Sequence, residues 1–157
     1  MDRKIIHPAY VSVLCEELHR RGAVIVFTNG VFDLLHPGHV QYLAEARALG
    51  THLIVALNTD ESAQRIKGLG RPIVPLEARA EVLAAMECVG FVTWFHEETP
   101  ADIIRLVKPD VLVKGGDWSP DRIVGRDFVE SRGGRVLNIP FREGYSTTGM
   151  IQKILDL

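Results

Sequence analysis

The sequence predicts an α/β fold, a Rossmann-like, doubly wound parallel sheet of about five strands with helices on both faces. Short, nearly all-apolar segments rich in β-branched residues recur along the chain, and such segments are typical of strands covered on both faces. Segments with apolar residues at helical spacing lie between them, and this alternation indicates a parallel sheet. No repeat or linker interrupts the 157 residues, so we expect one domain, 1–157.

The first part of the chain begins with a helix. Apolar residues recur at helical spacing over 8–21, and Gly22 ends the pattern. The segment AVIVFT at 23–28 is the first predicted strand. A helix from about 38 to 49 follows, and HLIVALN at 52–58 is the second predicted strand.

The same alternation continues to the end of the chain. The predicted elements are a helix over 76–88, a strand over 91–95, a helix from Thr99 and Pro100 (its cap and first turn) to Val107, a strand over 110–115, a helical turn opened by Ser119 and Pro120, a strand over 135–140 and a helix over 146–157. Parallel sheets bind ligands beyond the carboxyl ends of their strands, so we expect the site in the loops that follow the strands.

Composition and charge exclude several classes of protein. The formal net charge is -2 and aromatic residues make up 7% of the chain, which argues against the basic, aromatic-lined surface of a nucleic-acid-binding protein. No segment reaches the roughly 18 apolar residues of a membrane span, and MDRKIIHPAY lacks the apolar run of a signal peptide. We therefore expect a cytoplasmic protein without nucleic-acid or membrane partners.

The segment after the first strand, TNGVFDLLHPGH, has the residues of an anion site. It contains neither a Walker loop nor the GxGxxG dinucleotide fingerprint. His36, Gly38 and His39 instead stand at the start of a predicted helix, whose free N–H groups and partial positive charge suit a polyphosphate. Two histidines at this spacing are often ordinary surface or cap residues, but the preceding buried strand favours the anion site.

At this point the chain resembles a known family. GVFDLLHPGH resembles the GxFDxxHxGH signature of the cytidylyltransferase-like nucleotidyltransferase superfamily. The resemblance continues along almost the whole chain, where VALNTDESAQRIKGLGRPIVPLEARAEVLAAME, PDVLVKGGDW and EGYSTTGMIQKI are similar to its heptose-1-phosphate adenylyltransferase branch. In many bacteria that activity is fused to a sugar kinase, and here the resemblance implies a stand-alone adenylyltransferase.

The resemblance implies transfer of AMP from ATP to D-glycero-β-D-manno-heptose 1-phosphate, giving ADP-heptose and pyrophosphate for lipopolysaccharide or other surface glycans. A phosphate nucleophile is already ionised at neutral pH, so catalysis requires positioning and charge neutralisation rather than a general base. His36 and His39 would face the triphosphate in a protonated, donating state. Lys67 is expected to clamp a phosphate from a mobile glycine-bearing loop, although a solvated surface lysine is the alternative. Mg²⁺ is the expected cofactor, and no metal ligand is assigned.

The remaining site residues are assigned by the same resemblance. The expected nucleotide contacts are Thr28, Asn29, Gly30, Phe32, Gly38, Gly115, Asp117, Ser146, Thr147 and Thr148. Ser146 is also a helix cap in its own right, and Trp118 is as compatible with packing as with stacking on a ligand. The expected substrate contacts are Asp33, Asn58, Arg71 and Arg79. Asn58 is expected from its place at the end of the second predicted strand, and a surface position is the alternative for Arg71. Asp33 has an equally plausible role in stabilising a local turn, and an intrahelical pair with Glu77 or Glu81 is the alternative for Arg79.

Two other functions compete with the adenylyltransferase. The nearer one is a cytidylyltransferase acting on glycerol 3-phosphate or a similar alcohol phosphate, against which the KGGDW and RIKGLGRP segments favour the heptose enzyme. The other is a non-catalytic nucleotide-binding regulator, which the presence of both motif histidines disfavours. A homodimer or higher homo-oligomer is compatible with the resemblance, and the helix over 76–88 could serve either as an interface or as core.

Overall fold

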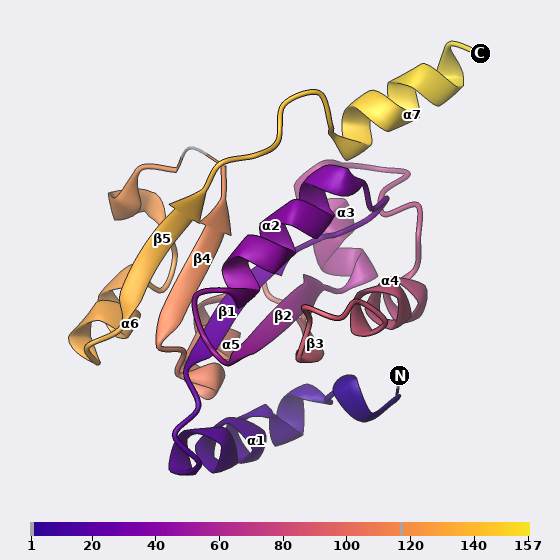
Figure 1. Ribbon diagram of the computed structural model, residues 1–157. Coiled ribbons are helices and arrows are strands. Elements are labelled where there is room, and N and C mark those ends of the chain that lie inside the picture. The colour runs from indigo at the N-terminus through magenta and orange to yellow at the C-terminus, as the bar shows by residue number, and fades with distance from the viewer. Residues whose placement is uncertain (1, 117) are drawn as a thin grey trace.

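The computed structural model describes residues 2–116 and 118–157. Five parallel strands form one sheet of order β3-β2-β1-β4-β5, and Figure 1 shows its arrangement with the helices. The strands are β1 (Ile25–Gly30), β2 (His52–Asn58), β3 (Phe91–Phe95), β4 (Val111–Gly115) and β5 (Arg135–Ile139). The predicted doubly wound α/β fold is confirmed. No helix in the described ranges is long and apolar enough to cross a membrane.

Helices cover both faces of the sheet. They are η1 (Asp2–Lys4), α1 (Pro8–Arg20), α2 (Pro37–Arg47), α3 (Asp60–Lys67), α4 (Leu76–Ala84), α5 (Ala101–Val107), η2 (Pro120–Arg122), α6 (Arg126–Ser131) and α7 (Thr147–Leu155). The two faces carry separate apolar cores. Val26 of β1 packs with α2 and α4, whereas its neighbours Ile25 and Phe27 pack with α1, α5 and α6, as the alternation of side chains along a strand requires.

The helix expected over 76–88 contributes to the core. Ala80, Leu83 and Ala84 of α4 are buried against the sheet. These three residues therefore belong to the core rather than to an interface. In contrast α7, all of whose residues the structure describes, has no buried side chain. Figure 1 shows α7 projecting away from the sheet.

Several boundaries differ from the prediction. The first strand lies at 25–30 rather than 23–28, and α4 ends at Ala84 rather than at residue 88. Helix α3 is absent from the prediction; the Thr59 hydroxyl caps it by accepting a hydrogen bond from Ser62 N. The prediction that Thr99 caps the next helix is wrong, because Pro100 holds the cap position of α5 and no side chain caps it.

The strand order reverses between β1 and β4, and these two strands separate toward their carboxyl ends. Their register pairs are Val26–Val111 and Phe27–Leu112, whereas β1 pairs with β2 along its whole length. The Tyr42 hydroxyl of α2 bridges the gap, lying 2.5 Å from Thr28 Oγ1 and 3.4 Å from the carbonyl oxygen of Val113. Doubly wound sheets bind ligands in the crevice that forms at such a reversal.

Candidate active site

A cavity of about 440 Å³ lies at this crevice, with walls from the loops after β1, β4 and β5 and from the end of α3. The structure brings most of the predicted site residues together here. Lining the cavity are Asn29, Gly30, Phe32, Asp33, His36, Gly38, His39, Lys67, Arg71, Gly115, Ser146, Thr147 and Thr148. Asp117, another predicted nucleotide contact, lies outside the described residues.

The two motif histidines form a stacked pair at the start of α2. Their ring centroids are 3.9 Å apart with an interplanar angle of 29°, and the Nδ1 atom of each ring is buried without a hydrogen-bond partner in the described structure. Gly38 permits this arrangement, because a Cβ at that position would lie 2.9 Å from His36 Nδ1. Two buried polar atoms without partners at a cavity wall are suited to a ligand that supplies the missing contacts.

Burial determines the charge of this pair. Burial lowers the pKa of His36, and burial together with the neighbouring His36 lowers the pKa of His39 to about 4. Both rings are therefore neutral at pH 7 in the ligand-free protein. The protonated, donating state expected beside phosphates therefore requires an anion in the cavity to compensate for the loss of water.

Two helix N-termini converge on the cavity. His36 is the N-cap residue of α2, and Ser146 is that of α7, where its hydroxyl accepts a hydrogen bond from Gly149 N. The predicted Ser146 cap is thus confirmed. Thr147 Oγ1 donates to the carbonyl oxygen of Leu34 at 2.9 Å and ties α7 to the loop before α2. Free N–H groups and helix dipoles from two directions favour an anion between them.

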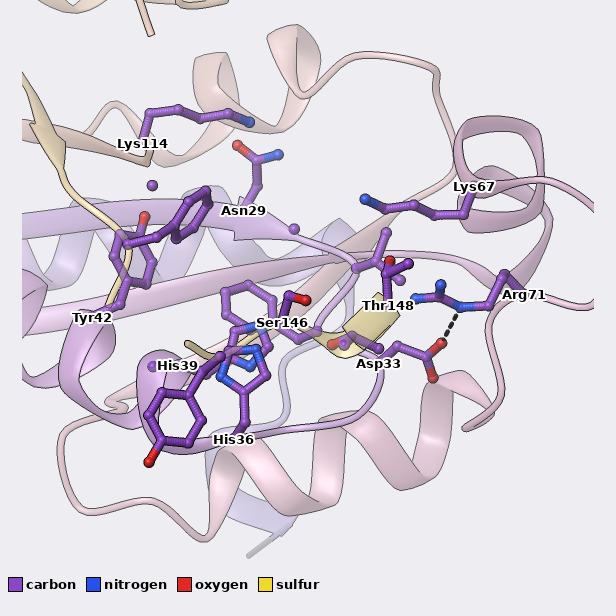
Figure 2. A pocket seen from close by; sticks show the side chains of 18 of the residues that line it. Asn29, Asp33, His36, His39, Tyr42, Lys67, Arg71, Lys114, Ser146 and Thr148 are labelled. Carbon is purple, nitrogen blue, oxygen red and sulfur yellow. Dashed lines mark hydrogen bonds and ion pairs between the residues drawn. The ribbon is translucent and has the colours of Figure 1, made fainter. Parts of the chain in front are cut away.

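Cationic side chains reach the cavity from two sides. Figure 2 shows Lys67 and Arg71 at one end and Lys114 at the other. Lys67 is the last residue of α3 rather than part of a loop, so the expectation of a mobile loop at this position is corrected. Burial and the neighbouring Lys67 charge lower the pKa of Lys114, because both disfavour its charged form.

Asp33 anchors one wall of the cavity. It accepts hydrogen bonds from Arg71 Nε at 2.7 Å and from the backbone N–H groups of Ile73 and Val74, each at 2.9 Å. Burial acts to raise the pKa of Asp33, but these three donors outweigh it and hold the pKa below its ordinary value. The carboxylate, with 1% of its side chain exposed, therefore positions Arg71 and the 71–74 segment rather than presenting an open ligand.

Three predicted contact residues are not brought into the cavity lining. Thr28 is fully buried and bonded to Tyr42. Asn58 is buried, and its Nδ2 donates to Ser62 Oγ at 2.9 Å. Arg79 is also buried, and its guanidinium is occupied by protein oxygens rather than by Glu77 or Glu81. These residues therefore stabilise the walls of the cavity rather than line it.

Sequence reasoning missed several lining residues. Lys114, Tyr42, Phe141 and Tyr145 belong to the cavity, and Trp118, for which packing and stacking stayed open, lines it as well. A lysine that ends an apolar strand directly before two glycines was a usable signal for Lys114. The aromatic residues stand singly in loops or on a helix, and no spacing pattern marks them.

Within residues 2–116 and 118–157, no group of three or more His, Cys, Asp or Glu side chains is arranged to hold a metal ion. Asp33, the carboxylate that lines the cavity, already has three protein donors. Mg²⁺ needs only one or two protein ligands when substrate phosphates and water supply the rest. The described residues therefore fit a metal that is bound mainly through phosphate and water oxygens.

The chain is similar to known proteins over nearly its whole length. Residues 27–153 match the cytidylyltransferase-like family. The protein named Bifunctional protein HldE from Pelobacter propionicus is 48% identical over 155 residues, which are 99% of this chain and 32% of the relative. Its namesake from Syntrophotalea carbinolica is 53% identical over the same shares. The chain thus spans about a third of the length of the curated relatives it matches.

A solved structure supports the fold. The crystal structure of the lipopolysaccharide core biosynthesis protein from Thermoplasma volcanium GSS1 has a TM-score of 0.65 and 28% sequence identity to this chain. The match covers 80% of this chain and 100% of the other.

Proposed function

The chain belongs to the cytidylyltransferase-like family, and on this premise we propose that it transfers AMP from ATP to D-glycero-β-D-manno-heptose 1-phosphate, giving ADP-heptose and pyrophosphate. The family and the nucleotidyltransferase class predicted from the HxGH motif are confirmed. The observation that carries the proposal is one cavity in which two helix N-termini, a stacked histidine pair and three cations meet. The names of the relatives, HldE and a lipopolysaccharide core biosynthesis protein, support the heptose substrate.

The arrangement suits in-line transfer. The triphosphate would lie along the N-termini of α2 and α7 beside His36 and His39, and the sugar phosphate between Lys67 and Arg71. An oxygen of the sugar phosphate forms a bond to the α-phosphorus, and the bond from that phosphorus to the oxygen bridging to the β-phosphate breaks. Pyrophosphate leaves with the electron pair. The cavity supplies positioning and positive charge, and the ionised nucleophile needs no base.

We propose Mg²⁺ as the cofactor; bound with the triphosphate, it would supply part of the positive charge that the departing pyrophosphate needs. The N-termini of α2 and α7, together with His36 and His39, would then share the neutralisation of the pyrophosphate with the metal. We place the reaction in the cytoplasm, where ATP is available.

The experiment that tests the proposal measures pyrophosphate release with Mg²⁺ for each pairing of ATP or CTP with heptose 1-phosphate or glycerol 3-phosphate. Release with ATP and the heptose phosphate alone is the expected result. Release with CTP and glycerol 3-phosphate would keep the family and overturn the substrates. Nucleotide binding without release in any pairing would favour a non-catalytic binding protein.

A further inference from the structure

At the end of the cavity opposite Lys67 and Arg71, an aromatic ring lies directly against glycine backbone. The ring of Phe141, in the loop after β5, rests on the backbone of Gly115 and Gly116. A Cβ on Gly115 would lie 2.8 Å from Phe141 Cε1, and one on Gly116 would lie 2.7 Å from Phe141 Cε2. Since real Cβ atoms do not approach so closely, the two glycines are what allows the ring to lie where it does.

The other side of this ring is open. Phe141 is 67% exposed although it is wholly apolar, and it lines the cavity rather than the outer surface alone. Trp118, which lines the same end, is 44% exposed, and the Lys114 ammonium lies 5.6 Å from the centroid of its ring. The Phe141 ring is held against backbone on one side and exposed on the other. The remaining walls of the cavity attract phosphate, so the ring presents a flat apolar surface to the part of the ligand that is not phosphate.

We propose that Phe141 is the stacking platform for the nucleobase and thereby sets how tightly the site binds the nucleotide. This inference rests on the proposed function and adds the position of the base. With the triphosphate at the N-termini of α2 and α7, the base of the same nucleotide lies toward Gly115 and stacks on the open face of Phe141. Aromatic stacking accepts any base, and stronger stacking by a purine favours adenine over cytosine.

The test compares two ligands that share the phosphate end. MgATP and Mg-tripolyphosphate are titrated calorimetrically into the wild type and the Phe141→Ala variant. We expect Phe141→Ala to weaken MgATP binding roughly tenfold, the loss typical of one base–aromatic stack, and to change tripolyphosphate binding less than about twofold. Phe141→Tyr should retain ATP affinity. Tyr10→Ala is the matched control, since Tyr10 is 68% exposed and does not line the cavity.

A second variant displaces the ring without removing it. Gly115→Ala places a methyl group against Phe141 and should weaken ATP binding in the wild-type background. In the Phe141→Ala background the same change should have a smaller effect, because only the contact of the new methyl group with Tyr42 Cε2 at 3.3 Å remains, and the two substitutions should be non-additive. Because the ring is exposed, its removal leaves no cavity in the core, and thermal unfolding should be unchanged.

Three results would count against the platform. Equal losses of affinity for ATP and tripolyphosphate in Phe141→Ala would mean that Phe141 supports the loop in general. Unchanged ATP affinity in Phe141→Ala would mean that the ring has no role in binding. Either result would leave the proposed function intact. Failure of the wild type to bind any nucleotide would overturn the proposed function and the platform together.

Discussion

At the residue scale, the charge of the two motif histidines should depend on whether a nucleotide is bound beside them. Their Nδ1 atoms have no partner within the described chain, and burial keeps both rings neutral in the free protein. A triphosphate supplies both hydrogen-bond acceptors and the negative charge that favours the imidazolium. Nucleotide binding should therefore be coupled to proton uptake.

The pH dependence follows from the sign of the shift. The pKa of His39 is about 4 in the free protein, and a bound triphosphate should raise it. MgATP affinity should accordingly rise as the pH falls through the raised pKa of His39 in the complex, with net proton uptake. Stability should change in the opposite sense. The unfolded chain binds the proton near its ordinary pKa of 6.5, so stability falls as the pH drops from 6.5 toward 4.

NMR titration of the His39 ring, with and without MgATP, measures this shift directly. Calorimetry in buffers of different ionisation enthalpy counts the protons taken up. A His39 pKa that stays near 4 in the complex, or binding without proton uptake, would show that the ring does not meet the phosphates.

Removing the ring tests its role in turnover. His39→Ala should lower kcat by about 100-fold or more, as removal of one transition-state contact typically does, while thermal unfolding changes little. The control is His52→Ala. His52 is the first residue of β2, at the end of that strand away from the cavity, and its ring stacks on Phe91. Near-normal turnover in His39→Ala would move the phosphate site elsewhere.

At the scale of elements, Arg79 joins segments that are distant in sequence. From α4 it donates to the carbonyl oxygens of Val74 at 2.9 Å, Val31 at 2.6 Å and Asn58 at 3.0 Å, and to Asp60 Oδ1 at 2.6 Å. The guanidinium thereby fixes the loop after β1, the end of β2 and the start of α3 around one buried charge. Each of these segments leads to a wall of the cavity.

Arg79→Lys should therefore lower stability rather than act on substrate binding alone. A lysine ammonium cannot span four acceptors, and the carbonyl groups left without donors should cost about 2 kcal/mol or more in the free energy of unfolding. Urea unfolding measures this loss. Arg105→Lys in α5, an exposed pair with Asp102, should change stability by less than about 0.5 kcal/mol. Unchanged stability in Arg79→Lys, with weaker sugar-phosphate use, would return Arg79 to the role of a substrate contact.

At the scale of the whole molecule, the sequence predicted the sheet well because buried parallel strands are continuous apolar segments. Strands β2 and β3 lie at 52–58 and 91–95, as predicted. Helix α3 escaped prediction because DESAQRIK lacks an apolar stripe, and the Thr59 cap and the burial of Ser62 and Ala63 stabilise it instead.

Part of the candidate site could also be predicted from the order of the strands. Motif residues that follow strands could be placed, since parallel strands bring their carboxyl ends together. The partners of Arg79 are backbone carbonyls from three separate segments, and the neutral state of His39 depends on its burial. Neither follows from residue spacing, and both required the folded chain.

Helix α7 gives a prediction about the molecule as a whole. It has no buried side chain, and Thr147 ties its first turn to Leu34, so its amides should exchange with little protection in the free protein. MgATP binding at its N-terminus should slow exchange over 146–155 and leave α4 unchanged. Hydrogen exchange followed by mass spectrometry measures both segments, and unaltered exchange of α7 at saturating MgATP would argue against a phosphate contact there.

Labelled phosphorus atoms of ATP distinguish transfer of the nucleotidyl group from transfer of the terminal phosphate. The protein is incubated with heptose 1-phosphate, Mg²⁺ and ATP labelled with ³²P at either the α or the γ position. We predict that the α label enters the sugar nucleotide and the γ label enters pyrophosphate in equal amounts. Transfer of the γ label to the sugar phosphate, with release of ADP, would contradict it.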